Sequence, residues 1–275
     1  MPLNNWYRKL AAGTVLLAAV GALQAQSRAA ATPNGYLGTS DAPDFLMVVP
    51  PAPVAGDARD TADRAIFRAT RSAQDSPRWT LAQHDADYSV AALLSSFSCA
   101  LETEPDARNA PRLSALLARA IADSNAATSR VKDRYKRRRP FLVDDGPICV
   151  ARDEFIVHSF DYPSGHSALG WVTGLILAEL EPDRAAAILA RARAYGESRI
   201  FCGVHNASAV EAGRIVGASV VAALHGSSAF HEDMRMAGAE LAALREHHGA
   251  AGQSCATEAL AVSESPYAPI PAAAR

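Results

Sequence analysis

The sequence lacks an excess of charge of either sign and has no long hydrophobic run. Its 275 residues include 27 Lys and Arg against 29 Asp and Glu, a formal net charge of -2. This balance argues against a general nucleic-acid binder, because that class carries a broadly basic surface. No stretch reaches the roughly 18 to 20 apolar residues of a spanning helix, which excludes a multi-span membrane protein. With 49% hydrophobic residues the chain can bury a real core, so wholesale disorder is excluded as well.

The N-terminal residues have the order of charge and hydrophobicity that is typical of a secretory signal peptide. Arg8 and Lys9 precede the apolar stretch Leu10–Leu23, and the small residues Ala22 and Ala25 could end the leader. We therefore predict a signal peptide over residues 1–25 and a periplasmic or secreted protein. An uncleaved anchor or a buried helix is the alternative interpretation.

Cysteine is scarce and widely spaced. The four cysteines, Cys99, Cys149, Cys202 and Cys255, lack the close spacing of a zinc knuckle. In an exported protein they could form two disulfides. Four cysteines allow three pairings, among which the sequence does not choose, and our working prediction is Cys99–Cys149 with Cys202–Cys255.

The sequence also lacks internal repeats and the alternation of apolar and polar residues that is typical of β-strands. Apolar residues at helical spacing are common after residue 60. The sequence predicts one all-α domain, a single helical bundle over 57–249. An extended Pro- and Ala-rich lead-in over 26–56 precedes it and a loose tail over 250–275 follows. We predict a loop over 143–163, and a capping box in which Ser208 caps a helix and Glu211 reaches back to it. The expected helices cover about 61–71, 88–101, 111–138, 164–180, 182–199, 208–224 and 228–247.

Three short motifs have residue types that suit a bound phosphate. Only two lysines follow the predicted leader, and one of them is Lys132. It lies seven residues before Arg139, a spacing that places both side chains on one face of a helix. Ser164 and Gly165 begin a predicted helix whose free N–H groups suit an anion, and His166 follows in its first turn. The third motif contains Arg199 and, six residues later, His205. Taken singly, a solvated basic face, an ordinary Ser cap and a structural His would each account for one motif.

Together the motifs Lys132-x6-Arg139-Pro140, Pro163-Ser164-Gly165-His166 and Ser198-Arg199-x5-His205 resemble the signature of bacterial class A nonspecific acid phosphatases. These enzymes belong to the superfamily of type 2 phosphatidic acid phosphatases and vanadium haloperoxidases. The order and spacing agree, and the resemblance covers about residues 62–244. It is extended by the flanking segments AIFRATR, SPRW and FSCAL.

The resemblance implies a role for each matching residue. Lys132, Arg139, Arg199, Ser164 and Gly165 would hold the phosphoryl oxygens, His205 would attack phosphorus, and His166 would protonate the leaving alcohol. Three cations can neutralise the transferred group without a metal, so no cofactor is expected, and vanadate should inhibit as a phosphate mimic. We expect the two histidines to have pKa values shifted apart, which gives a bell-shaped pH profile on the acid side.

One position departs from the family pattern. The third motif normally ends with an Asp four residues after the nucleophilic His, and here that residue is Ala209. A carboxylate at that point orients the imidazole and supports its positive charge. We hypothesise that another group does so here, and the candidates are Glu211, Asn206, Ser208, Asp153, Glu154 and Asp161.

The expected function is thus an exported phosphatase acting on small phosphomonoesters such as nucleotides, sugar phosphates and aryl phosphates. No nucleic-acid partner or integral membrane association is expected, and homo-oligomerisation is left open. The alternatives are a vanadate-dependent haloperoxidase, a lipid phosphatase, and a weakened or non-catalytic phosphate-binding protein. The last of these draws its support from Ala209.

Overall fold

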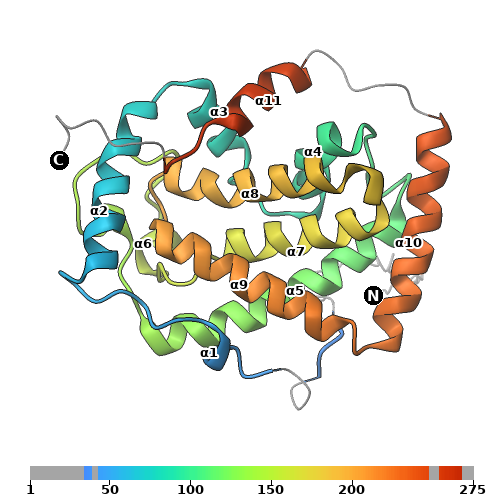
Figure 1. Cartoon of the computed structure of the whole chain (residues 1–275), viewed down its shortest axis with the longest axis horizontal. Coiled ribbons are helices and arrows are strands. Elements are labelled where there is room, and N and C mark those ends of the chain that lie inside the picture. The colour runs from blue at the N-terminus through green and yellow to red at the C-terminus, as the bar shows by residue number, and fades with distance from the viewer. Residues whose placement is uncertain (1–33, 39–42, 248–253, 268–275) are drawn as a thin grey trace, which may run out of the picture. The chain divides into compact units, whose positions relative to one another are not determined.

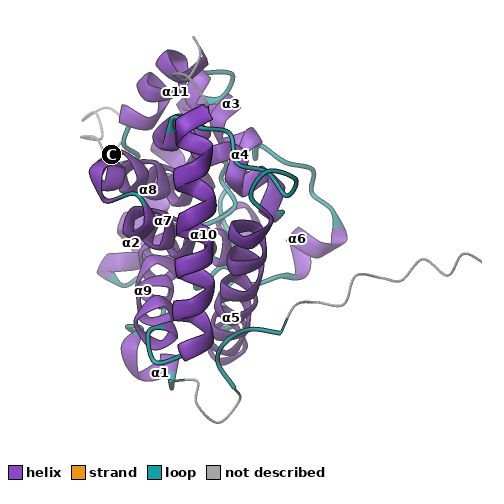
Figure 2. Ribbon diagram, turned by 90° about the vertical axis from the view of Figure 1, so that its right-hand side faces the viewer, coloured by secondary structure: helices purple, strands orange, loops and turns teal. Residues whose placement is uncertain are grey.

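A computed structural model describes residues 34–38, 43–247 and 254–267 of the chain. Within these ranges the secondary structure is helical and includes no strand, as Figure 2 shows, which confirms the predicted all-α fold. The predicted signal peptide over residues 1–25 lies outside the described residues.

The helices follow one another with short connections in most places (Figure 1). Single 3₁₀ turns occur at Arg71–Ala73, Pro140–Leu142 and Pro182–Arg184. The helices are α1 (Phe45–Val48), α2 (Ala58–Thr70), α3 (Pro77–His84), α4 (Val90–Leu101), α5 (Pro111–Tyr135), α6 (Glu154–His158), α7 (Gly165–Leu180), α8 (Ala185–Phe201), α9 (Ala207–Leu224), α10 (Ser228–His247) and α11 (Ser254–Ser263).

Local capping explains where several helices begin. The side chains of Asp57, Ser76, Ser89 and Ser164 accept hydrogen bonds from backbone N–H groups in the first turns of α2, α3, α4 and α7. The sequence analysis missed α3, although Ser76 followed by Pro77 is a cap followed by a favoured first helical residue.

Helix α7 lies at the centre of the core. It packs against α8, α9 and α5, and Figure 1 shows α8 and α9 on either side of it. Its residues Leu169, Val172 and Ile176 are almost completely buried, so the helix is apolar around most of its circumference. The start of α9 approaches α7 closely at Gly213, where an added Cβ would lie 2.5 Å from the carbonyl oxygen of Ser164. A side chain there would force the two helices apart.

Helix α9 is the only helix among the described residues that is long and apolar enough to cross a membrane by composition. It has 18 residues with a mean hydropathy of 1.4, and 56% of it is buried inside the protein. Its buried residues, including Val210, Val216 and Val220, contribute to the packed interior, as expected of a core helix.

The structure differs from the predictions for one helix start, the tail and the lead-in. The predicted capping box does not form, because the N-cap residue of α9 is Asn206, two residues before Ser208, and Ser208 instead bonds with Asp63 of α2. Glu211 pairs with Arg214 and Tyr267. The tail is not loose throughout, since residues 254–263 form α11, and the lead-in includes the single turn α1.

The disulfide pairing also differs from the working prediction. Cys99 of α4 is bonded to Cys255 of α11, and Cys149 is bonded to Cys202 at the end of α8. The pairing follows from tertiary packing. α11 lies against α3 and α8, and the segment that contains Cys149 runs beside the end of α8, where its N–H donates to the carbonyl of Cys202 at 3.0 Å.

Candidate active site

A cavity of about 490 Å³ brings the three sequence motifs together. Six of the seven predicted site residues line it, although they come from four separate segments of the chain. These six are Lys132 of α5, Arg139 after α5, Gly165 and His166 of α7, Arg199 of α8, and His205 before α9. The seventh, Ser164, is fully buried behind the cavity, where its Oγ accepts from the N–H of Ser167 at 3.3 Å.

Arg139 is held in a fixed orientation by three residues. Its guanidinium donates to the hydroxyl of Ser159 at 2.8 Å, to the carbonyl of Val204 at 2.7 Å, and to Nε2 of His205 at 3.0 Å. Burial lowers the pKa of Arg139 to about 10, an effect that Asp161 opposes. The group therefore remains a cation at neutral pH and presents a pre-oriented charge to an anion.

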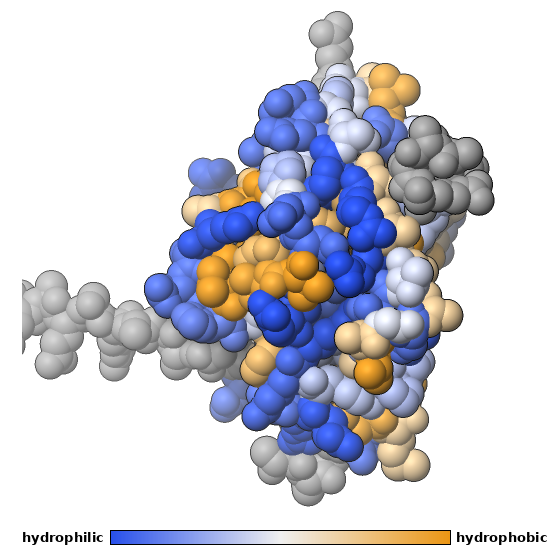
Figure 3. Space-filling view, turned by 90° about the vertical axis from the view of Figure 1, so that its left-hand side faces the viewer, coloured by the Kyte–Doolittle hydropathy of each residue, from blue (hydrophilic) through white to orange (hydrophobic). Residues whose placement is uncertain are grey.

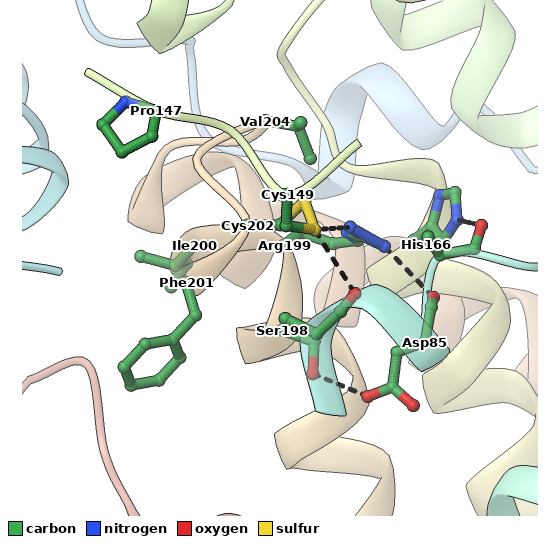
Figure 4. Close-up of a disulfide and its surroundings, with 12 residues drawn as sticks. Asp85, Pro147, Cys149, His166, Ser198, Arg199, Ile200, Phe201, Cys202 and Val204 are labelled. Carbon is green, nitrogen blue, oxygen red and sulfur yellow. Dashed lines mark hydrogen bonds between the residues drawn. A yellow bond between two sulfur atoms is a disulfide. The ribbon is translucent and has the colours of Figure 1, made fainter. Parts of the chain in front are cut away.

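Arg199 is buried beside the Cys149–Cys202 disulfide. Figure 4 shows its guanidinium between the sulfur of Cys149 and the backbone carbonyl of Asp85, and the hydrogen bond to that carbonyl is 3.1 Å long. The carboxylate of Asp85 accepts from Ser198, the neighbour of Arg199, at 2.6 Å. Asp85 was not anticipated from the sequence, yet its backbone and side chain both support this end of α8.

The charge of Lys132 is strongly perturbed. Burial, followed by the nearby charge of Arg139, lowers its pKa from 10.5 to about 7, and Asp161 opposes the change. Its ammonium donates to the carbonyl of Phe160. A bound anion would favour the charged form of this lysine and raise its pKa.

The first turn of α7 forms part of the cavity lining beside the three cations. Gly165 lines the cavity, and the free N–H groups of a 16-residue helix begin there. Ser164 holds this helix start in place both through its cap and through its N–H, which donates to the carbonyl of Ala209 at 2.9 Å. The structure thus places Ser164 as a support for the α7 terminus rather than in the cavity lining.

The two contacts of His205 define its tautomer. A guanidinium can only donate, so Nε2 accepts from Arg139, and Nδ1 carries the proton that it donates to Asp161 Oδ1 at 3.1 Å. Burial, followed by the charges of Arg139 and Lys132, lowers the pKa of His205 well below 6.5. The imidazole is therefore neutral, with the lone pair of Nε2 beside the cations.

A tight turn brings His205 back to the cavity after α8. Gly203 has a φ of +77°, a conformation that side chains rarely adopt, and an added Cβ would lie 2.4 Å from an Arg71 nitrogen. The N–H of His205 then bonds to the carbonyl of Arg199 at 3.2 Å. The turn thereby links the position of Arg199 to that of the His205 imidazole.

His166 differs from the expectation of pKa values shifted apart. Burial and then the charge of Arg199 lower its pKa to about 3, so both histidines are shifted downward in the ligand-free protein. The expectation of opposite shifts is therefore wrong for this state. Nε2 of His166 donates to the carbonyl of Ala86 at 3.0 Å, which leaves Nδ1 as the nitrogen for proton transfer.

Of the candidates to replace the carboxylate missing at Ala209, Asp161 is the one in contact with His205. Asn206 bonds to Asp161 rather than to the imidazole, and Ser208 bonds with Asp63. The other three carboxylates have separate partners. Asp153 caps α6, Glu154 pairs with His158, and Glu211 pairs with Arg214.

One side of the cavity is apolar and was missed by the sequence analysis. Its lining includes Tyr88, Val150, Phe155, Ile156 and Leu169. Phe155 and Ile156 belong to the five-residue helix α6, inside the segment predicted to be a loop, and Phe155 is 70% exposed. The run of three consecutive apolar residues from Phe155 to Val157 would have been the available signal. Figure 3 shows that the molecular face on the left-hand side of Figure 1 is mostly hydrophilic, with its largest hydrophobic patch near the centre and smaller hydrophobic areas elsewhere.

Within the described part of the chain, no group of three or more His, Cys, Asp or Glu side chains could hold a metal ion. The cavity is lined by the cations Lys132, Arg139 and Arg199, by the two imidazoles and by the carboxylate of Asp153, which caps α6. This arrangement can bind a tetrahedral oxyanion and place a neutral imidazole nitrogen beside it.

Comparisons with known proteins agree with this chemistry. The PAP2 superfamily model matches residues 113–231. An acid phosphatase of Zymomonas mobilis is 41% identical over 199 residues, which is 72% of this chain and 75% of the relative. A non-specific acid phosphatase of Providencia stuartii is 34% identical over 213 residues, 77% of this chain and 86% of the relative. A non-specific acid phosphatase of Salmonella typhimurium is 33% identical over 195 residues, which is 70% of this chain and 78% of the relative.

Proposed function

This chain belongs to the PAP2 superfamily and, within it, to the non-specific acid phosphatases, and on that premise we propose that it is an exported enzyme that hydrolyses phosphate monoesters through a phosphohistidine. It is a phosphoric monoester hydrolase. The finer proposal covers the covalent intermediate on His205, the absence of a metal requirement, and location in the periplasm or medium.

The observation that carries the mechanism is the state of His205. Its imidazole is neutral, its Nε2 lone pair lies 3.0 Å from an Arg139 nitrogen, and it lines the same cavity as two other cations. A phosphate monoester bound by Lys132, Arg139 and Arg199 would bring its phosphorus beside a nucleophile that needs no deprotonation, once Arg139 turns its N–H from His205 Nε2 to a phosphoryl oxygen.

The first step forms the bond between His205 Nε2 and phosphorus and breaks the bond from phosphorus to the ester oxygen. The cations and the N-terminus of α7 neutralise the charge of the transferred group. The departing alkoxide takes the Nδ1 proton of His166. A water molecule then attacks phosphorus and gives a proton back to Nδ1 of His166 while the bond from phosphorus to His205 Nε2 breaks, which releases inorganic phosphate and free His205.

The role of His166 requires that its pKa rise when substrate binds. In the ligand-free protein its pKa is about 3, with burial as the largest cause. The negative charge of a bound phosphoryl group favours the imidazolium and raises this pKa. Nδ1 is the nitrogen that would carry the transferred proton, because Nε2 is bonded to the Ala86 carbonyl.

Export is supported by the leader-like residues 1–25 and by two disulfides. Cys99–Cys255 and Cys149–Cys202 use all four cysteines, which suits an oxidising compartment. Sequencing the N-terminus of the protein recovered from the periplasm or medium would identify the cleavage point. Retention in the cytoplasm with residues 1–25 intact would contradict the proposal.

The mechanism is tested by p-nitrophenyl phosphate hydrolysis from about pH 4 to about pH 9 with EDTA present. We expect EDTA-resistant turnover that is lost in His205→Ala and kept in His225→Ala, whose histidine lies on the surface beside Glu179. Labelling with a ³²P substrate and quenching in alkali should trap a phosphoenzyme in the wild type alone. Turnover that survives in His205→Ala, or that EDTA abolishes, would refute the mechanism.

A further inference from the structure

Asp161 is a fully buried carboxylate that contacts the proposed nucleophile from a different segment of the chain. It lies between α6 and α7, four residues before Gly165 and 44 residues before His205. Its Oδ1 accepts from Nδ1 of His205 at 3.1 Å and from the N–H of Asn206 at 3.0 Å. Its Oδ2 accepts from the amide of Asn206 at 2.8 Å and from Arg137 at 3.3 Å.

We propose that Asp161 is the positioning residue for His205 and takes the part of the carboxylate that is absent at Ala209. This inference rests on the proposed function. Asp161 holds the imidazole in the Nδ1–H tautomer, so that Nε2 keeps its lone pair for phosphorus. When Nε2 becomes bonded to phosphorus, the ring gains positive charge, which the carboxylate then stabilises.

Arg137 and two carboxylates of α2 keep Asp161 oriented. Arg137 bonds to Asp161 and also to Asp60 at 2.9 Å and Asp63 at 2.8 Å, both on α2. Burial raises the pKa of Asp161, and Arg137 is the largest influence that opposes the rise. The backbone helps as well, because the N–H of Asp161 donates to the carbonyl of Arg137 at 2.8 Å.

The surroundings of Ala209 agree with Asp161 as the carboxylate that orients His205. Its side chain is completely buried in the main hydrophobic core, and its carbonyl is occupied by the N–H of Ser164. The His205 proton is already paired with Asp161 at hydrogen-bonding distance. A carboxylate added at position 209 would be a second acceptor for the same proton.

The kinetic test compares Asp161→Asn with the wild type and with Glu211→Gln, a control carboxylate that pairs with Arg214 and Tyr267. We expect kcat for p-nitrophenyl phosphate to fall about 10²- to 10⁴-fold in Asp161→Asn. The dissociation constant of sulfate, which forms no bond to His205, should change less than about threefold, because the three cations are untouched. An unchanged kcat, or a loss of sulfate affinity as large as the loss of kcat, would overturn the inference.

A spectroscopic test does not depend on turnover. In ¹⁵N-histidine-labelled protein, with the His205 signals assigned from His205→Ala, we expect a solvent-protected proton on Nδ1. Asp161→Ala should remove that protection, and Glu211→Gln should keep it. Identical His205 signals in the wild type and Asp161→Ala would overturn the inference. If the wild type has no turnover, the proposed function fails, and this test still decides the role of Asp161.

A third arm uses Ala209→Asp in the otherwise unchanged chain. Because Asp161 already serves His205, we expect a gain in kcat below about tenfold. A gain of about 100-fold or more would show that the site lacked a competent carboxylate, and would overturn the inference.

Discussion

Replacing Lys132 with arginine tests whether this buried ammonium makes anion binding depend on pH. Burial and the neighbouring Arg139 lower the pKa of Lys132 to about 7. In the ligand-free protein the lysine therefore loses its proton as the pH rises above about 7, whereas a bound anion keeps it charged. Anion binding then takes up a proton above that pH, so affinity must fall as the pH rises.

The size of the effect follows from the pKa. If only the protonated form binds tightly, affinity scales as the protonated fraction, which falls about tenfold between pH 6 and pH 8 and about 90-fold between pH 6 and pH 9. In the ligand-free protein the pKa of His166 is about 3, that of His205 is well below 6.5, and that of Arg139 is about 10, so none of these groups changes charge in this window. An anion that raises the pKa of His166 adds a proton uptake that the wild type and Lys132→Arg share, so the effect of Lys132 is the difference between their two profiles.

The assay is calorimetric binding of sulfate, whose charge stays constant from about pH 6 to about pH 9. Lys132→Arg should keep its charge throughout and flatten the profile, because a guanidinium remains protonated in proteins. Lys136→Arg is the matched control, since Lys136 is the exposed C-cap residue of α5. A flat profile in the wild type, or equal slopes in the wild type and Lys132→Arg, would refute the reasoning.

Three further outcomes are expected from the cavity wall, the disulfide and the turn before His205. Phe155→Ala should raise KM for p-nitrophenyl phosphate about three- to tenfold and leave KM for acetyl phosphate within about twofold, because only the aryl group uses the apolar wall. Equal changes for the two substrates would contradict this role. Replacing Cys149 and Cys202 together with serine should lower the unfolding free energy by about 4 kcal/mol, since the bond closes a 53-residue separation, and unchanged denaturant unfolding would disprove it. Gly203→Ala should lower both the melting temperature and kcat, because φ is +77° and a Cβ would lie 2.4 Å from a guanidinium nitrogen. Gly238→Ala, which meets only an ordinary contact at 3.4 Å, should change neither, and equal effects of the two variants would refute the argument.

Much of the helical framework could be predicted from sequence because its signals are local. Helical periodicity and flanking Ser, Pro and Gly residues located α5, α7 and α10 to within a few residues. The misses have physical causes. α3 and α6 are short, and α11 follows a segment of small residues, so their helices depend on packing rather than on a long periodic pattern.

The candidate site could be predicted where its residues are adjacent or at helical spacing. The positions in the three motifs identified six cavity-lining residues in advance. Ser164 was predicted as a phosphate ligand, but the fold uses it as a cap behind the cavity. The pKa of His166 could not have been anticipated, because its largest cause is burial, which only the tertiary structure defines.

The sequence by itself determined the family, the helical fold, and six of the residues that line the cavity, because motif spacing and helical periodicity depend on near neighbours. Tertiary structure decided the contacts between distant segments. Asp161 and His205 are 44 residues apart, and Cys99 and Cys255 are 156 apart. Asp161 meets His205 because α7, α8 and α9 pack into one core and bring their flanking loops together, and Cys99 meets Cys255 because α4 and α11 both pack against α8. No local pattern distinguished Asp161 from the other carboxylates, because its partner is chosen by that packing and by the burial that accompanies it.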